Sequence, residues 1–344
     1  MPLADIADWV WYDDASPGAQ VARAALLPLS AVFGAIVARR NRWFDRHAPP
    51  PSPIPAISIG NLTVGGTGKT PVSAWFAARF SLAGATPAVV LRGYGDDEAQ
   101  VHRTLNPGLH VVAGADRVAA VKAAAKAGAD IAILDDAFQH RRAARVADVV
   151  LVSADRWTGR DTLLPAGPFR EGLASLQRAT LVVVTVKAAA PTAVVSVVDA
   201  LRQVTSAPIT VVDIQPGALV FAGGVAAVEP PSWVGTKVLS VSGIGDPRSF
   251  EAQLEEMGLL RRSVVLADHH RYDDATVRRL IADSVGRDAV VCTLKDAVKL
   301  APLWPSSAVP LWYLSQSVVP RDGATALDAV VRTVLEARRF GSPL

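Results

Sequence analysis

The sequence predicts an α/β fold, with a parallel sheet covered by helices on both faces and a second, smaller α/β domain. Two observations favour this fold class. Short apolar runs rich in valine and isoleucine alternate with helical patterns along most of the chain, which is typical of parallel α/β layers. The chain has 344 residues, of which 50% are hydrophobic, and this is enough for two domains with their own buried cores.

Residues 1–47 are predicted to form a membrane-interfacial segment. From Ala24 to Ala38 the chain is apolar except for Ser30, and arginines with Trp43 follow. At about 1.5 Å per helical residue, this run is shorter than the roughly 30 Å hydrocarbon core of a bilayer. A helix with its apolar face among acyl chains and its arginines at anionic headgroups therefore fits better than a spanning one. A helix buried in the protein core is the alternative.

Residues 48–213 are predicted to form the larger α/β domain. Val72, Phe76 and Phe80 recur at four-residue spacing, which predicts a helix, and another helix is expected at 116–127. The strands of this domain are expected at residues 57–60, 88–92, 110–113, 130–134, 148–152 and 181–186.

Residues 214–344 are predicted to form the smaller α/β domain. Its boundary is placed within 214–236, where glycine, proline and aromatic residues show no clear periodicity. Beyond this segment the patterns predict three strands and three helices. The strands are expected at 237–241, 263–267 and 289–293, and the helices at 247–257, 276–285 and 324–340.

The segment from Gly60 to Pro71 has the pattern of a phosphate-binding loop, because it follows a predicted strand and opens a predicted helix. Its glycines let backbone N–H groups turn toward phosphate oxygens at a helix N-terminus. Lys69 is expected to reach the β- and γ-phosphates of a nucleoside triphosphate, and the Thr70 hydroxyl to bind Mg²⁺. The strict pattern has glycine where this chain has Thr63. The nucleotide-binding residues are predicted to be Thr63, Val64, Gly65, Gly66, Thr67, Gly68, Lys69 and Thr70.

Two carboxylates, Asp135 and Asp136, end a buried apolar strand. Ligands bind at this end of an open parallel sheet, and an acidic residue after a core strand holds Mg²⁺ in P-loop proteins. The direct metal ligand is left open among Asp135, Asp136 and Thr70. Gln139 and His140 follow at once and are assigned to substrate binding.

The composition excludes some classes of protein. A single cysteine, Cys292, cannot form an internal disulfide, which favours a reducing, cytosolic compartment. The formal charge of +3 without a basic stripe argues against a nucleic-acid binder. The P-loop and carboxylates alone do not separate a kinase from a regulatory or partition-type ATPase or GTPase acting on a protein partner. Thr293 to Asp296 imitates a guanine-reading motif, but a structural or substrate role is preferred for it.

The order of motifs resembles that of the tetraacyldisaccharide 4'-kinase (lipid A 4'-kinase) family of Gram-negative bacteria. The resemblance implies a P-loop kinase-type domain and a smaller α/β domain that contributes to the substrate cleft. It also implies ATP and Mg²⁺ as cofactors, and phosphorylation of the 4'-hydroxyl of tetraacyldisaccharide 1-phosphate to lipid IVA, the lipid A precursor. The residues that carry it lie at 60–71, 91–95, 116–119, 134–140, 163–171, 243–247, 268–272 and 295–300.

The resemblance also implies a catalytic pair that activates the acceptor hydroxyl. Aligning Asp97 and Glu98 with the family's acidic pair makes Asp97 the general base, with His269 as its partner and Glu98 a candidate metal ligand. Asp96 is a rival for Asp97, because the insert after Arg92-Gly-Tyr is shorter than the family's, and His270 is a less favoured rival for His269. Arg92 is expected to contact a phosphate, and Lys69 to act in catalysis.

The family's lipid substrate also bears on localisation and partners. A kinase that acts on a membrane-embedded lipid is expected at the cytoplasmic face of the inner membrane, as a peripheral or interfacially anchored protein. The N-terminal segment suits that role. No nucleic acid or obligatory protein partner is expected.

Overall fold

The structure, a computed structural model, describes residues 3–93, 97–226, 232–245, 247–267 and 270–340. Packing divides the chain into two compact units. Unit 1 comprises residues 1–94, 102–214 and 318–344, and unit 2 comprises residues 95–101 and 215–317.

The strands of unit 1 form a parallel sheet in the order β3-β2-β4-β1-β5-β6-β7. The central strand β1 has Asp135 of β4 and Val149 of β5 opposite its Ile59. All six strands predicted for the larger domain are present, with bounds shifted by one residue at most. They are β1 (Ala56–Asn61), β2 (Pro87–Leu91), β3 (His110–Ala113), β4 (Ile131–Asp135), β5 (Ala147–Ser153) and β6 (Leu181–Val186), and β7 (Ile209–Gly223) starts beside β6.

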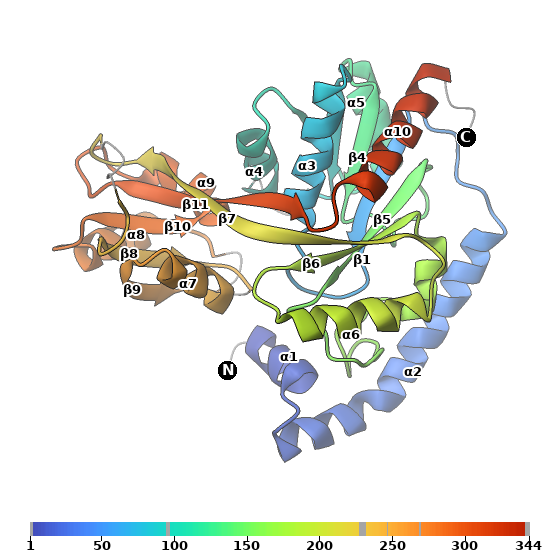
Figure 1. Cartoon of the computed structure of the whole chain (residues 1–344), viewed down its shortest axis with the longest axis horizontal. Helices are drawn as coiled ribbons and strands as arrows, with labels where there is room; N and C mark the ends of the chain where they lie inside the picture. The colour runs from blue at the N-terminus through green and yellow to red at the C-terminus, as the bar shows by residue number, and fades with distance from the viewer. Residues whose placement is uncertain (1–2, 94–96, 227–231, 246, 268–269, 341–344) are drawn as a thin grey trace. The chain divides into compact units, whose positions relative to one another are not determined.

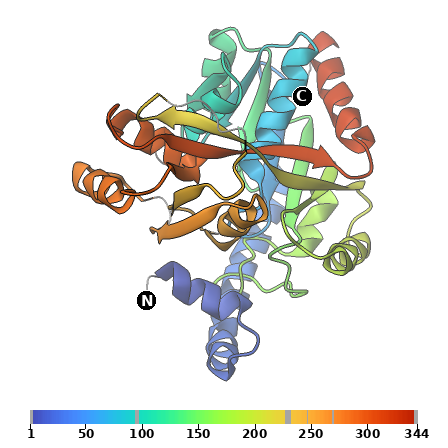
Figure 2. The ribbon, with the colours of Figure 1, turned by 60° about the vertical axis from the view of Figure 1, so that its left-hand side comes forward.

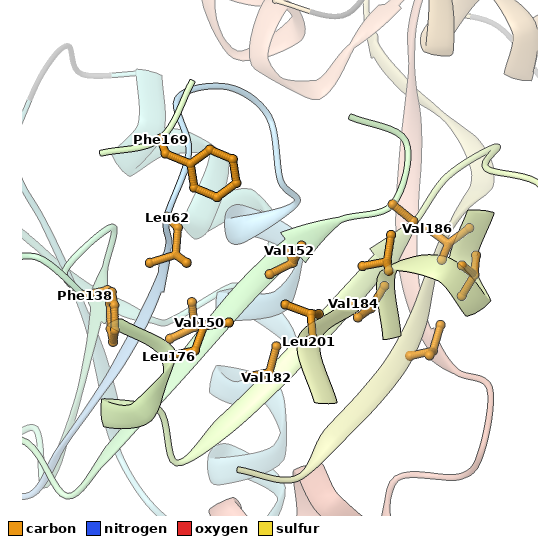
Figure 3. Close-up of a cluster of buried hydrophobic side chains, with 14 residues drawn as sticks. Leu62, Phe138, Val150, Val152, Phe169, Leu176, Val182, Val184, Val186 and Leu201 are labelled. Carbon is orange, nitrogen blue, oxygen red and sulfur yellow. The ribbon is translucent and has the colours of Figure 1, made fainter. Parts of the chain in front are cut away.

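Helices cover both faces of this sheet, as predicted. On one face, α6 (Pro191–Arg202) packs on β5 and β6, where Leu201 lies among Val150 and Val182 (Figure 3). The same face carries α5 (Arg117–Lys126), which Asp116 caps. On the other face lies α3 (Lys69–Leu82), with α10 (Thr325–Phe340) beside it in both views (Figures 1 and 2).

The position of α10 differs from the sequence-based domain division. Residues 318–344 were assigned to the smaller domain, but packing groups them with unit 1. Arg79 of α3 forms an ion pair of 2.7 Å with Asp328, and Arg338 forms one of 2.6 Å with Asp130. These contacts join residues about 200 or more positions apart, so no local pattern could have indicated them.

Unit 1 also holds the N-terminal helices α1 (Leu3–Tyr12) and α2 (Pro17–Asp45). The predicted apolar run is the middle of α2, which continues through Pro28 for 29 residues in all. By length and composition this helix is able to cross a membrane, and only 6% of its most apolar 18-residue window is buried. Because so little of this window is buried, α2 is not a core helix, which was the alternative.

The strands of unit 2 are β8 (Lys237–Ser242), β9 (Leu260–Val265), β10 (Ala289–Thr293) and β11 (Leu311–Pro320), in the order β11-β10-β8-β9 with parallel pairing. The second part of β7 lies next to β11. The helices are α7 (Pro247–Glu256), α8 (Asp274–Asp283) and α9 (Leu294–Leu300). Neither β7 nor β11 is among the strands that the sequence predicts, and β7 extends into the segment without clear periodicity. Strand β7 is half exposed and contains Pro216 and Gly217, so it lacks the alternation of apolar and polar residues that marks a typical strand.

One helix crosses the boundary between the units. Helix α4 (Asp97–Leu105) has residues 97–101 in unit 2 and residues 102–105 in unit 1. The sequence patterns do not predict this helix, although Asp97 and Glu98 were expected to be site residues. Asp97 and Glu98 lie in the first helical turn, where carboxylates interact favourably with the helix dipole.

Candidate active site

The phosphate-binding loop connects β1 to α3 and requires its glycines. Gly65 has φ +113° and Gly68 has φ +80°, and a Cβ on Gly68 would collide with Ile214. The buried Thr67 fixes the loop from inside, because its hydroxyl accepts from Asn61 Nδ2 at 2.9 Å and its carbonyl accepts from the Thr185 hydroxyl at 3.0 Å. Lys69 is the first residue of α3 and Thr70 the second. The loop therefore has the geometry of a helix N-terminus that binds anions.

Asp136 lies beside the loop's lysine. Its carboxylate is 3.7 Å from Lys69 Nζ and accepts hydrogen bonds of 3.0 and 3.2 Å from the two terminal nitrogens of Arg170. Burial raises the pKa of Asp136, but Lys69 and Arg170 outweigh it, so the pKa lies below its usual value. Its φ of 49° turns the chain sharply after β4. The structure thus brings together Lys69 and one of the two predicted carboxylates.

Asp135 has different surroundings, although it is the next residue in the chain. Its Oδ2 is 3.0 Å from His102 Nε2, and its backbone carbonyl accepts from Arg117 Nη2 at 3.2 Å. His102 is fully buried and Asp135 is 7% exposed. Within the described ranges, no group of three or more histidine, cysteine or acidic side chains is arranged to hold a metal.

Arg170 is a site residue to which the sequence analysis gave no catalytic role. Besides binding Asp136, its guanidinium donates to the Thr63 carbonyl at 3.1 Å and to Asn61 Oδ1. The segment that carries it runs beside the loop, since Val64 N donates to the Pro168 carbonyl at 2.8 Å. Arg170 lies in the stretch 163–171, which is one of those that carry the family resemblance. Its proximity to the loop depends on tertiary contacts, so the sequence alone did not indicate it.

The other residues predicted in unit 1 lie near these strand ends. Gln139 Nε2 donates to the Asn61 carbonyl at 2.8 Å, next to the loop. His140 is half-buried; burial, with Arg117 and Arg145 nearby, lowers its pKa. Arg92 directly follows β2 and is exposed.

In unit 2 the structure describes Asp97 and His270, whereas Asp96 and His269 lie outside the described residues. Asp97 Oδ2 is 3.7 Å from Lys299 Nζ on α9. Lys299 also donates to the His270 carbonyl at 3.1 Å. Glu98 follows Asp97 in the same turn of α4 and is half-buried. Lys299 was not singled out from the sequence, because nothing local links it to Asp97.

The imitation of a guanine-reading motif at residues 293–296 has a structural role. Thr293 caps α9 by accepting from the Asp296 N–H at 3.3 Å. The Asp296 side chain is fully buried and accepts from the hydroxyls of Tyr272 and Thr293, at 2.8 and 2.7 Å. A carboxylate enclosed in this way is unavailable to read a base, so the structural preference is confirmed.

Comparison with known proteins gives one consistent answer. Residues 22–336 match the family described as LpxK, tetraacyldisaccharide-1-P 4'-kinase. A tetraacyldisaccharide 4'-kinase of Chlorobaculum parvum is 33% identical over 355 residues, covering 93% of this chain and 97% of the relative. One of Halorhodospira halophila is 35% identical over 350 residues, covering 95% and 97%.

A solved structure agrees with this match. The crystal structure of LpxK from Aquifex aeolicus in complex with ATP superposes with a TM-score of 0.73 at 25% identity, covering 91% of this chain and 99% of that one. The match of the family spans nearly the whole chain, including both units and most of α2. The chain therefore belongs to the LpxK family of tetraacyldisaccharide-1-phosphate 4'-kinases.

Proposed function

We propose that this chain is an ATP-dependent kinase that phosphorylates the 4'-hydroxyl of tetraacyldisaccharide 1-phosphate to give lipid IVA, the lipid A precursor. The observation that carries the proposal is the family match over residues 22–336, which includes the phosphate-binding loop. The placement of Lys69 beside Asp136 supports it, because phosphoryl transfer needs cations and a metal-binding carboxylate around one phosphate. We propose that residues 1–47 form the membrane-interfacial segment and residues 48–213 the kinase domain, to which packing adds residues 318–344. The smaller domain is proposed to contribute to the substrate cleft.

For the nucleotide, the proposal assigns residues 63–70 to the phosphates of ATP. Mg²⁺ suits the oxygen donors of Thr70, Asp135 and Asp136, because this ion prefers one or two carboxylates together with phosphate oxygens. Asp136 is the partly exposed carboxylate of the two, with 42% of its side chain accessible. Bound by these residues, Mg²⁺ would neutralise charge on the phosphates of ATP. Glu98 stays a further candidate ligand.

For the acceptor, the proposal assigns Asp97 as the general base and His269 as its partner. A sugar hydroxyl that attacks phosphorus needs positioning and late removal of its proton, so a carboxylate suffices. Arg92 is proposed to contact phosphate, and Gln139 and His140 to bind substrate. Gln139 lies next to the loop through its hydrogen bond to Asn61, which supports a role near the transferred group.

For localisation, we propose interfacial anchoring at the cytoplasmic face of the inner membrane. The exposed apolar side chains of α2 support contact with a membrane. One stripe of this helix contacts unit 1, where Ser30 Oγ donates to the Leu163 carbonyl at 2.9 Å and Gly34 approaches the Leu163 side chain. The opposite stripe is apolar and exposed, and with 3.6 residues per turn its members share one face. It comprises Val21, Leu29, Val32, Ile36 and Trp43. A helix held along one side by folded protein suits an interface better than an isolated span.

The kinase assignment is tested with purified protein, Mg²⁺, γ-labelled ATP and tetraacyldisaccharide 1-phosphate in mixed micelles. We expect a labelled bisphosphorylated lipid, and sharply less of it from Asp97→Ala and from His269→Ala. Transfer that persists in Asp97→Ala but not in Asp96→Ala would move the base by one residue. Labelled phosphate released to water, with no labelled lipid, would contradict the kinase and favour a regulatory ATPase or GTPase.

A further inference from the structure

Unit 2 contains a buried polar cluster that no role described above requires. At its centre is Asp296, whose fully buried carboxylate accepts from the Tyr272 and Thr293 hydroxyls and, at 3.0 Å, from the Gly243 N–H. Burial and the neighbouring Asp296 raise the pKa of Tyr272, so its hydroxyl stays a donor. Burying a carboxylate is costly unless it receives such donors. The cluster is therefore complete in itself and rigid.

Lys299 lies on the edge of this cluster, one helical turn after Asp296. Its ammonium is 3.9 Å from Asp296 Oδ1, donates to the His270 carbonyl at 3.1 Å and lies 5.5 Å from the centre of the Tyr272 ring. A lysine side chain normally retains much rotamer freedom, and holding it costs entropy. Three neighbours fixed by the fold hold this one, and only 18% of its side chain is exposed.

The same ammonium is 3.7 Å from Asp97 Oδ2, and the Asp97 side chain is 11% exposed. We propose that Lys299 is a positioning residue for the kinase reaction, and that it holds the Asp97 carboxylate in the direction from which it accepts the proton of the attacking hydroxyl. This inference rests on the proposed function of Asp97. The same ammonium donates to the carbonyl of His270, the residue that follows the proposed partner His269 in the sequence.

The kinetic consequence follows from this geometry. Misplacing a reacting group by about 1 Å costs on the order of 100-fold in rate, so removing the ammonium is expected to lower kcat by about 10- to 100-fold. The KM values for ATP and for the lipid are expected to change by less than about 3-fold, because Lys299 orients a protein group without binding substrate.

The positive charge of Lys299 can be removed by mutation and then restored chemically in the full-length protein. Cys292 is the only cysteine and is fully buried, so the thiol of Lys299→Cys, at a position with 18% of its side chain exposed, is the more accessible of two in the full-length protein. Alkylation with 2-bromoethylamine forms a thioether, releases bromide and restores an ammonium at nearly the length of lysine. Alkylation with iodoacetamide adds similar bulk without charge. Lys237→Cys, at the exposed start of β8 in the same unit, is the control and is expected to keep near-wild-type kcat before and after either treatment.

We expect Lys299→Cys to lose kcat, 2-bromoethylamine to restore at least a third of it, and iodoacetamide to restore none. Lys299→Arg, which keeps the charge, is expected to retain more activity than Lys299→Met and replaces Lys299→Cys if that variant does not fold. In an Asp97→Asn background, removing Lys299 is expected to cost less than about 2-fold, because residues acting as a unit are not additive.

Several results would overturn the inference. A normal kcat without the ammonium would remove its role, and a rise in lipid KM at constant kcat would make Lys299 a substrate contact. Equal recovery with iodoacetamide would indicate packing alone, and full additivity with Asp97→Asn would place its effect elsewhere. Wild-type protein that makes no labelled lipid would reject the kinase itself, whereas failure of the rescue with an active wild type rejects only the role of Lys299.

Discussion

Two buried or half-buried aspartates show opposite uses of a carboxylate in this molecule. Asp136 of unit 1 faces cations, Lys69 and Arg170, and keeps 42% of its side chain accessible. Asp296 of unit 2 is inaccessible and receives its hydrogen bonds from hydroxyls and a backbone N–H. A partly accessible carboxylate among cations can exchange those partners for a metal ion and leave the cations to a phosphate. A carboxylate enclosed by hydrogen-bond donors holds loops together instead. The comparison predicts loss of catalysis at one aspartate and loss of stability at the other.

The largest expected effect is on catalysis at Asp136. Asp136→Asn should lower kcat by about 10²- to 10³-fold, the range observed when one group that stabilises transition-state charge is removed. Its free energy of unfolding should fall by less than about 1 kcal/mol, because ion pairs of accessible side chains contribute little. The micelle kinase assay and urea unfolding measure the two quantities on the same preparation. A large loss of stability with normal kcat would reverse the comparison.

The next effect is on stability at Asp296. Asp296→Ala leaves the hydroxyls of Tyr272 and Thr293 without an acceptor in a buried place, which should lower the free energy of unfolding by about 3 kcal/mol. Asp296→Asn, which keeps one acceptor oxygen, should lose less. Urea unfolding followed by tryptophan fluorescence gives both values. An Asp296→Ala protein as stable as wild type would show that the cluster does not hold unit 2 together.

The next effect is on liposome binding by the exposed apolar side chains of α2. Val32 and Ile36 are 59% and 62% exposed. Replacing both by serine should weaken binding to anionic liposomes by about 100-fold, since each apolar side chain that enters the bilayer contributes roughly 1.5 kcal/mol. ATP affinity should not change. Ala25→Ser, on the same face, is a milder control, and an equal loss of ATP binding and folding in the double variant would argue for a structural role.

The smallest effect is the pH dependence of stability that Asp136 causes. Its folded pKa is below the unfolded value of about 3.9, so its stabilising contribution is complete above that pH and disappears as the pH falls through the folded pKa. Urea unfolding at pH 3 and at pH 6 should therefore show a smaller stability difference between wild type and Asp136→Asn at pH 3 than at pH 6. A difference that grows toward pH 3 would contradict the depressed pKa.

The local patterns of the sequence determined much of the fold. The strand expected at 181–186 is β6, and the loop predicted to bind phosphate lies between β1 and α3. Such predictions succeed because apolar periodicity and the need for glycine at positive φ are properties of a few consecutive residues. Local motifs also identified Lys69, Asp135 and Asp136 as candidate site residues. They assigned no role to Asp97 and His269, whose predicted roles come from the family resemblance.

The tertiary structure alone decided which distant residues share a place. It put α10 against α3, Arg170 against Thr63, and Lys299 against Asp97, pairs that are 100 or more residues apart in the chain. It also separated two consecutive aspartates, giving Asp135 to His102 and Asp136 to Lys69. No periodicity encodes such contacts, because their energy comes from packing between elements and is realised only when the whole chain folds.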